Sequence, residues 1–252
     1  MPCPVALELF SVRNLYKEDF EACLAKTAAI GYAGVECFGE PTLPAERVAA
    51  ALKASGLAIV GWHMPINLLE GGPLAGTMAY LKAIGCTRAI VPWAGPENFA
   101  TREATLAFAE RLMAIRKAME PFGIALGYHN HAQEFIPHAD GTLPWAVLMD
   151  NTDIIAQLDN GNALVSGTPG LDTAALAAQW PGRAVTVHVK PYSFTTGHNA
   201  MIGEDDIDWP AFISAAQGPG GAEWLIIEYE CEERYSQFEG VEVCLKALQK
   251  FL

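Results

Sequence analysis

Basic residues are scarce in this sequence, and their scarcity argues against nucleic acid as a partner. The 252 residues include 16 Lys and Arg against 29 Asp and Glu, which gives a formal net charge of −13 at pH 7. A surface with that balance repels a phosphate backbone. We interpret the acidic excess as a contribution to solubility, and we predict no nucleic-acid partner.

Long apolar runs and paired cysteines are also absent from the sequence. No stretch approaches the roughly 20 apolar residues that span a bilayer, and the first residues, MPCPVALELF, have no basic region ahead of their short apolar run. The six cysteines are scattered, with no CxxC pair and no zinc-finger spacing, which is typical of reduced thiols. We therefore expect a cytoplasmic protein without a membrane partner, and the sequence leaves homo-oligomer formation open.

What the sequence does contain is a regular alternation of β-rich and helical segments. Eight short apolar runs are spaced along it: VALELF (5–10), GVECF (34–38), LAIVGW (57–62), RAIVPW (88–93), IALGYHN (124–130), IIAQLD (154–159), AVTVHV (184–189) and WLIIEY (224–229). Helical patterns follow them, near 17–30, 74–84, 102–119 and 144–149, and after Pro44, Asp172, Asp208 and Ser236. Apolar strands separated by helices predict a parallel sheet covered by helices. Eight such units in about 250 residues predict one (β/α)8 TIM barrel domain over residues 1–252.

Local capping signals mark the ends of several of these helices. Gly31 follows the first helical pattern, as expected of a residue that ends a helix. Asp172 can cap the helix that follows it. Ser236 with Glu239 three residues later predicts a capping box.

Polar side chains concentrate at one end of the predicted strands. The strands begin with apolar residues: Val5, Val35, Leu57, Ile124, Ile154 and Leu225. Their other ends carry Glu36, Trp62, His63, Trp93, His129, Asn130, His131, Glu134, Asp159, Asn162, His188, Lys190, Glu228 and Glu230. Active sites of such barrels are built at the carboxyl ends of the strands. Because carboxylates buried close together are costly unless a cation or hydrogen bonds compensate them, this pattern predicts a functional site.

Four of these residues suit a divalent cation. Glu134, Asp159, His188 and Glu228 supply three carboxylates and one imidazole, a set that suits Mn²⁺, Mg²⁺, Co²⁺ or Zn²⁺ without choosing among them. Each residue alone has an ordinary structural interpretation, as a helix cap, an ion-pair partner or a buried histidine. Four such groups on the ends of strands five to eight make chance a weaker explanation.

The stretch GYHNHAQEF (127–135) places two histidines close together at the end of the fifth strand. Alternation puts His129 and His131 on the same side of the strand, with Asn130 facing the other way. Both cannot easily bind one metal ion whose other ligands come from strands six to eight. At least one of the two is then free to act as a general acid or base. The alternative interpretation is a hydrogen-bonded pair in the upper layer of the barrel.

Seven segments in order along the chain resemble the sugar phosphate isomerase/epimerase-like group of xylose isomerase-type TIM barrels. They are GYAGVECFG (31–39), GWHMPINLL (61–69), YHNHAQEF (128–135), QLDNGNALVSG (157–167), VHVKPY (187–192), GEDDIDW (203–209) and IIEYE (226–230). The combination of YHNHxxEF with LDxGN and HVK is typical of a subset of the group. The resemblance implies one divalent metal ion held by a strand-five glutamate, to which we assign Glu134, together with Asp159, His188 and Glu228.

The sequence also departs from the better-known members of that group. His129 stands near the place of the strand-five glutamate of the ketose 3-epimerases, and Asn162 stands where they have a histidine. Their substrate-binding arginine has no counterpart in SFTTGHNAMIGEDD (193–206), where His198 lies. The apurinic nucleases of the same group need more histidines, and Trp93 and Asn162 occupy positions where imidazoles are expected. DNA repair is therefore disfavoured.

The function that this resemblance implies is a metal-dependent sugar isomerase or epimerase. The expected cofactor is one divalent ion, Mn²⁺ ahead of Mg²⁺, Co²⁺ and Zn²⁺, and the reaction is proton abstraction next to a carbonyl through a metal-stabilised enediolate. We expect His129, His131 and Glu228 to carry protons. Substrate contacts are expected from Glu36, Trp62, His63, Trp93, Lys190 and His198, although the two tryptophans also suit ordinary packing.

Two other functions remain open. The same site suits a lyase or dehydratase that acts on a keto-sugar, a keto-inositol or a 3-keto-glycoside, because loss of a neighbouring oxygen from the same enediolate gives elimination. A sugar-binding barrel without catalysis is the third interpretation, and the complete set of candidate ligands argues against it. The expected partner is a small sugar or keto-sugar, and the lack of a basic cluster beyond Lys190 favours an unphosphorylated one.

Overall fold

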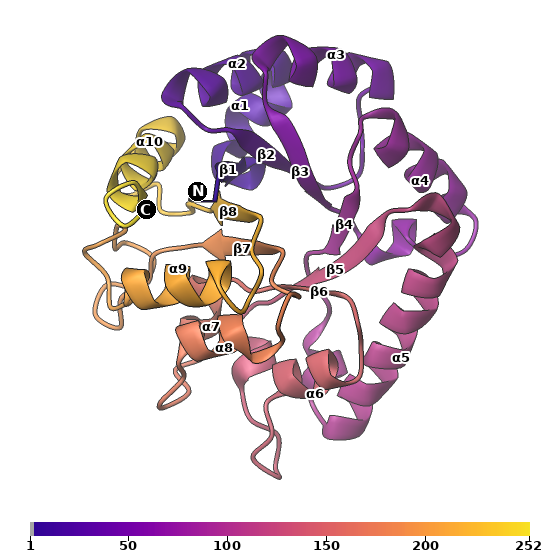
Figure 1. The fold of residues 1–252 in the computed structure, drawn as a ribbon, viewed down its shortest axis with the longest axis vertical. Coiled ribbons are helices and arrows are strands. Elements are labelled where there is room, and N and C mark those ends of the chain that lie inside the picture. Colours follow the sequence, from indigo (N-terminus) through magenta and orange to yellow (C-terminus); the bar gives the residue numbers. More distant parts are fainter. Residues whose placement is uncertain (1–2) are drawn as a thin grey trace.

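Eight parallel strands form the centre of the structure, a computed structural model that describes residues 3–252 (Figure 1). The strands are β1 (Val5–Glu8), β2 (Gly34–Phe38), β3 (Ala58–His63), β4 (Arg88–Val91), β5 (Ala125–His129), β6 (Ile155–Gln157), β7 (Thr186–Val189) and β8 (Trp224–Ile227). Their order is β6-β5-β4-β3-β2-β1-β8-β7. Between β6 and β7 the circle is completed by a parallel bridge of Asp159 with His188. The predicted (β/α)8 barrel is confirmed.

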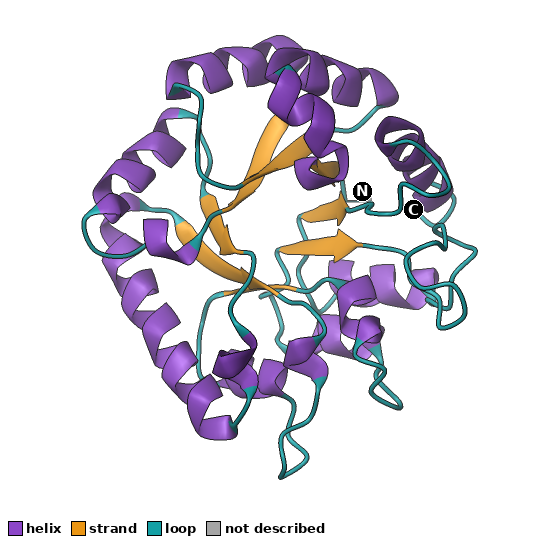
Figure 2. Ribbon diagram, turned by 180° about the vertical axis from the view of Figure 1, so that it is seen from behind, coloured by secondary structure: helices purple, strands orange, loops and turns teal. Residues whose placement is uncertain are grey.

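Helices surround the strands on all sides (Figures 1 and 2). They are α1 (Arg13–Glu18), α2 (Phe20–Ile30), α3 (Ala45–Ser55), α4 (Pro73–Ala83), α5 (Arg102–Met119), α6 (Pro144–Asp150), α7 (Asn160–Val165), α8 (Thr173–Gln179), α9 (Trp209–Gln217) and α10 (Gln237–Leu248). Short 3-10 turns lie between them: η1 (Leu9–Val12), η2 (Ile66–Leu68), η3 (Pro96–Phe99), η4 (Glu120–Phe122) and η5 (Gln133–Phe135). Within residues 3–252 every helix is too short or too polar to cross a membrane.

The predicted helix ends are confirmed where a local hydrogen bond defines them. Asp172 accepts from the amides of Ala174 and Ala175 at 2.9 and 3.0 Å. Ser236 and Glu239 form the capping box of α10. Gly31 ends α2 with a φ of 112°, a conformation that glycine adopts without strain.

Two boundaries differ from the prediction because side chains interrupt the backbone pattern. The helix predicted over 17–30 is divided at Asp19, whose extended backbone (φ −148°, ψ 96°) ends α1 while its carboxylate caps α2 through the Ala22 amide. The strand predicted over 5–10 ends at Glu8, because the Glu8 carboxylate accepts from the Phe10 amide at 3.1 Å and starts the turn η1.

The interior of the barrel changes from apolar to polar along the strands. Ala6, Val60 and Ile226 form a small buried cluster near the amino-terminal ends. Glu8 and Glu228 come two residues after Ala6 and Ile226 and face the same side, because side chains alternate along a strand. The polar groups therefore lie beyond an apolar layer, toward the carboxyl ends of the strands.

Candidate active site

A pocket of about 360 Å³ opens at the carboxyl ends of the strands. Its lining residues are Glu8, Phe10, Phe38, Gly39, His63, Pro65, Pro92, Trp93, His129, His131, Glu228 and Glu230. That volume lies within the range of about 300–1,000 Å³ that is usual for small-molecule sites. The location agrees with the general placement of active sites in such barrels.

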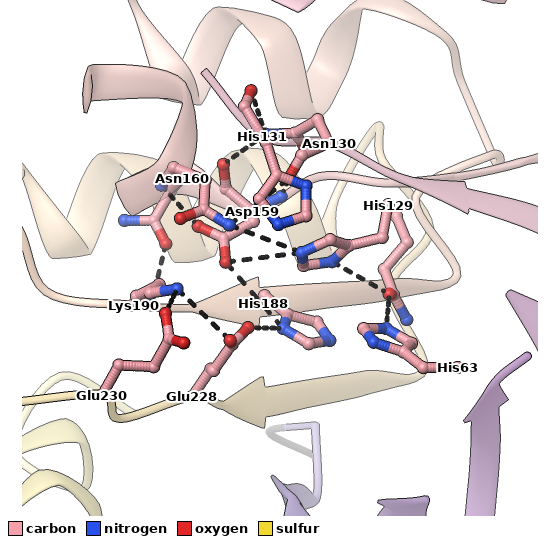
Figure 3. A network of polar contacts seen from close by, with 12 residues as sticks. His63, His129, Asn130, His131, Asp159, Asn160, His188, Lys190, Glu228 and Glu230 are labelled. Carbon is pink, nitrogen blue, oxygen red and sulfur yellow. Dashed lines mark hydrogen bonds and ion pairs between the residues drawn. The ribbon is translucent and has the colours of Figure 1, made fainter. Parts of the chain in front are cut away.

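Four buried side chains converge beside this pocket (Figure 3). His129, Asp159, His188 and Glu228 each offer one ligand atom, and these atoms lie within 4.8 Å of one another. Oδ2 of Asp159 lies 3.9 Å from Nε2 of His129 and 3.9 Å from Nδ1 of His188. Nδ1 of His188 is 2.7 Å from Oε2 of Glu228. These four residues are named here the upper group.

The upper group fits a divalent cation. Oδ2 of Asp159 is buried and has no hydrogen-bond partner, whereas Oδ1 accepts from the Asn162 amide at 2.7 Å. An unpaired buried carboxylate oxygen is costly, and two imidazole nitrogens face it at a distance too long for a hydrogen bond. Two carboxylates and two imidazoles are a donor set that Mn²⁺, Co²⁺ and Zn²⁺ accept.

Glu134, the fourth predicted ligand, lies on the other side of β5. Its carboxylate accepts from the Tyr128 hydroxyl at 2.6 Å and from the His131 amide at 2.8 Å. The Tyr128 ring contacts Phe108 of α5 and Trp145 of α6, so Tyr128 points toward the helices. The structure therefore brings together three of the four predicted ligands, and it places His129 rather than Glu134 beside them.

A second set of polar side chains supports the upper group from below. Glu36 accepts from Nε2 of His188 at 2.7 Å and from Nε2 of Gln157 at 3.0 and 3.2 Å. Nε2 of His63 lies 3.1 Å from Oε2 of Glu36 and 2.7 Å from Oε1 of Gln157. Glu36, predicted as a substrate contact, is fully buried and does not line the pocket.

Sequence reasoning missed Glu8 and Gln157. Glu8 pairs in register with Glu36, and Gln157 pairs with His129. Each is the last residue of its strand. The carboxyl end of the first strand would have identified Glu8, and amide side chains at strand ends would have identified Gln157.

Burial and neighbouring charges together set the pKa values of the buried side chains in this site. Burial raises the pKa of Glu8 to about 8. Burial would also raise the pKa of Glu36, but His63 and His188 outweigh it and hold that pKa well below its ordinary range. Burial, with the neighbouring imidazoles, lowers the pKa of His129 well below its ordinary value. His129 is therefore neutral at pH 7, which is the form of an imidazole that binds a metal ion.

Lys190 is held beside the upper group by two carboxylates (Figure 3). Nζ of Lys190 lies 3.2 Å from Oε1 of Glu228 and also contacts Glu230. Burial would lower the pKa of Lys190, but Glu228, Asp159 and Glu230 raise it. The charged ammonium thus orients Glu228 at the edge of the pocket.

The other predicted substrate contacts divide between the pocket and the packing around it. Trp93 lines the pocket with 54% of its surface exposed. Trp62 is buried, donates from its indole to the Gly39 carbonyl at 2.7 Å and packs edge-on against Tyr80 of α4. His198 is half-buried against Tyr192 and is not among the lining residues.

His131 lines the same pocket. Its ring is 5.3 Å from the ring of His129, and its Nδ1 is buried without a hydrogen-bond partner. Burial lowers the pKa of His131 to about 4. Asn130 between them faces away, as predicted, and exchanges hydrogen bonds with the backbone of Asp159 at 2.8 and 3.0 Å.

Comparison with protein families gives one match that covers most of the chain. The matching family is described as xylose isomerase-like TIM barrel, and the match covers residues 24–250. No curated protein sequence matches the chain.

Several solved structures have the same fold. A sugar phosphate isomerase/epimerase from Parabacteroides distasonis ATCC 8503 superposes with a TM-score of 0.82 at 20% identity, covering 98% of each chain. An L-ribulose 3-epimerase has a TM-score of 0.72 at 16% identity, over 99% of this chain and 94% of that one. An AP endonuclease, family 2, from Brucella melitensis has a TM-score of 0.68 at 18% identity, over 96% and 97%. These similarities show the shared barrel.

Proposed function

Because the chain belongs to the xylose isomerase-like TIM barrel family, we propose that it is a sugar isomerase or epimerase that uses one divalent metal ion. The upper group of His129, Asp159, His188 and Glu228 holds the ion. The observation that carries this proposal is the buried, unpaired Oδ2 of Asp159, which faces two imidazole nitrogens beside a pocket. A cation at this point would compensate the carboxylate.

The similar structures support a sugar as the substrate. Two of them are a sugar phosphate isomerase/epimerase and an L-ribulose 3-epimerase. The pocket volume of about 360 Å³ suits a monosaccharide. The face of Trp93 is exposed at the pocket and can pack against a sugar ring.

The chain's own residues supply proton transfer and orientation. A bound divalent cation would polarise the carbonyl of a sugar and make the neighbouring carbon–hydrogen bond more acidic. His131 presents an unpaired Nδ1 at the pocket and is the first candidate to take that proton. Glu228 lines the same pocket and is the second candidate. His129, expected as a proton carrier, is reassigned to the metal because its Nε2 faces Asp159.

A nuclease activity is the alternative that the Brucella melitensis neighbour raises, and two observations oppose it. The net charge of −13 repels DNA. Trp93 and Asn162 stand where the resemblance to the apurinic nucleases calls for imidazoles. We therefore retain a small sugar as the substrate.

Isotope exchange tests this function directly. The purified protein is incubated in D₂O with Mn²⁺ and a panel of ketoses, inososes and 3-keto-glucosides, and the substrates are examined by NMR. Deuterium is expected at a carbon next to the carbonyl, with interconversion of isomers and dependence on the metal ion. A dehydrated or cleaved product would instead identify a lyase.

Two variants separate the metal from the fold. Asp159→Asn removes a ligand of the upper group, so it is expected to lose both bound Mn²⁺ and deuterium exchange. Asp153→Asn is the matched control, because Asp153 is exposed and pairs with Arg116 outside the site. Absence of any bound divalent ion, together with absence of exchange on every substrate, would refute the proposed function.

A further inference from the structure

We propose that Gln157 and Glu36 are positioning residues for the two candidate imidazole ligands. Gln157 sets the tautomer of His129, which turns an unprotonated nitrogen toward Asp159, and Glu36 holds the ring of His188. This inference rests on the proposed function, because the tautomer matters only if His129 binds a metal ion. The tautomer itself can be measured in protein without metal. Glu36 was expected to contact substrate, and its fully buried carboxylate assigns it this different role.

The orientation of the Gln157 amide follows from its neighbours. One end of the amide lies 3.0 and 3.2 Å from the two oxygens of Glu36 and 3.0 Å from the Thr186 hydroxyl. A carboxylate only accepts hydrogen bonds, so this end must be the NH₂ group. The carbonyl oxygen of Gln157 is therefore the end that faces the imidazoles.

That carbonyl oxygen determines the tautomer of His129. Nδ1 of His129 lies 3.2 Å from Oε1 of Gln157, and a carbonyl can only accept, so Nδ1 carries the hydrogen. In a neutral imidazole the other nitrogen then has a free lone pair. This nitrogen, Nε2, faces Oδ2 of Asp159 at 3.9 Å and Nδ2 of Asn162 at 3.4 Å. The ligand nitrogen is thus turned to the cation site before any cation binds.

Glu36 holds the ring of His188 without choosing its tautomer. Nε2 of His188 donates to Oε2 of Glu36 and Nδ1 donates to Oε2 of Glu228, each at 2.7 Å, so both nitrogens carry hydrogens in the metal-free protein. Nδ1, which also faces Asp159, would give up its hydrogen when a cation binds. When a carboxylate accepts a hydrogen bond from the ring nitrogen that does not bind the metal, it fixes the orientation of the histidine ring. It also makes the metal-binding nitrogen more basic. Glu36 and Gln157, named here the hub, therefore orient both candidate ligands. Glu36 contacts His188 directly and acts on His129 through Gln157.

The backbone provides room for this hub at Gly61. The pairing of β2 with β3 shifts register after Val35 and sets Gly61 opposite Glu36. A Cβ at Gly61 would lie 2.2 Å from Oε1 of Glu36. The carboxylate thus occupies space that only glycine leaves free.

A second metal ion is the competing interpretation of the same residues. Glu8, Glu36, His63 and His188 could also hold a cation by their composition and spacing. However, the Glu36 carboxylate already accepts from His188 and Gln157, and Nε2 of His63 lies 3.1 Å from its Oε2. A cation there would break the bond that orients His188. We therefore expect one ion per chain.

Nitrogen NMR of the full-length protein tests the inference. Histidine labelled with ¹⁵N reports which ring nitrogen carries the proton. In metal-free wild type we expect His129 protonated at Nδ1 only. In Gln157→Leu this preference is expected to be lost, and the Kd for Mn²⁺ is expected to rise by about 10- to 100-fold, as for other positioning residues around metal ligands. Gln237→Leu is the control, since it removes a buried glutamine of α10 that lies outside the cluster.

Glu36→Gln is the second variant, and it retains the shape of the side chain. Its amide can donate to Nε2 of His188, which would leave the hydrogen of a neutral His188 on Nδ1, the nitrogen that faces Asp159. Weaker Mn²⁺ binding is therefore expected although the volume is unchanged. His129 protonated at Nε2 in the wild type would overturn the inference. Unchanged tautomer and Kd in Gln157→Leu would also overturn it, as would two ions per chain by elemental analysis. Failure of the wild type to bind any divalent ion would refute the proposed function alone, because the tautomer of His129 is measured independently in metal-free protein.

Discussion

Replacement of Glu134 by glutamine separates two roles for this residue. The sequence predicts that Glu134 binds the metal ion, whereas the structure places its carboxylate against Tyr128 and the His131 amide, on the helix side of β5. Glutamine has nearly the same shape and remains neutral at every pH. Glu134→Gln therefore tests the buried charge and the metal site in one protein.

The size of the effect follows from the pKa. Burial raises the pKa of Glu134 from 4.5 to about 7, against the opposing hydrogen bonds from Tyr128 and His131. The folded protein therefore holds this proton more tightly than the unfolded chain, and the free energy of unfolding falls as pH rises between these two values. At about 1.4 kcal/mol per pKa unit, Glu134 lowers the stability of the wild type by about 3 kcal/mol above this window and by little below it.

The assay is urea denaturation of metal-free protein, followed by circular dichroism, near pH 5 and near pH 8.5. Glu134→Gln is expected to gain about 2.5 kcal/mol over the wild type between these two conditions, which corresponds to about 5–10 °C in melting temperature. Glu103→Gln, on the exposed surface of α5, controls for the loss of one negative charge. A difference that does not change with pH would refute the argument from burial.

The same variant tests the assignment of the metal ligands. Because Glu134 lies outside the upper group, Glu134→Gln is expected to retain one divalent ion after dialysis. Loss of the ion from a folded variant would return Glu134 to the ligand set.

Three further predictions concern the metal ion, the pocket and the barrel interior. Addition of Mn²⁺ to about 100 times its Kd is expected to stabilise the protein by about 2.7 kcal/mol, a rise of about 5–11 °C that EDTA reverses in differential scanning calorimetry. Trp93→Ala is expected to raise KM without lowering the melting temperature, and Trp62→Phe to do the opposite, because only Trp93 lines the pocket; equal effects in steady-state kinetics would contradict this division. Gly127→Ala would place a Cβ 2.4 Å from Cδ1 of Ile90, and such overpacking costs about 1–3 kcal/mol. Adding Ile90→Val should recover part of that loss in urea denaturation.

Predictions from local chemistry were confirmed where the local interaction is enough to define the structure. Asp172 caps α8 and the Ser236–Glu239 box begins α10 because these bonds join residues two or three positions apart. The alternation of apolar strands and helices is likewise a property of each segment, and it led to the eight-stranded barrel. The resemblance to xylose isomerase-type barrels is confirmed by the family match.

The positions of Glu134 and His129 required the tertiary structure. Alternation predicts the side of a residue only within a strand, and β5 ends at His129. Glu134 lies five residues later in the turn η5, where the rule no longer applies. Its place in the YHNHxxEF motif therefore says little about whether it lies near Asp159 in space.

By itself, the sequence determined the fold and the kind of site: eight strand–helix units with histidines and carboxylates at the strand ends. Both are consequences of residue periodicity, which depends on neighbours along the chain. Only the tertiary structure decided which of these groups meet, because closing the barrel brings β1, β2, β5, β6, β7 and β8 to one axis. The hub of Glu36 and Gln157 joins residues 121 positions apart. No local pattern encodes such a contact, since it depends on the register of strands around the whole barrel.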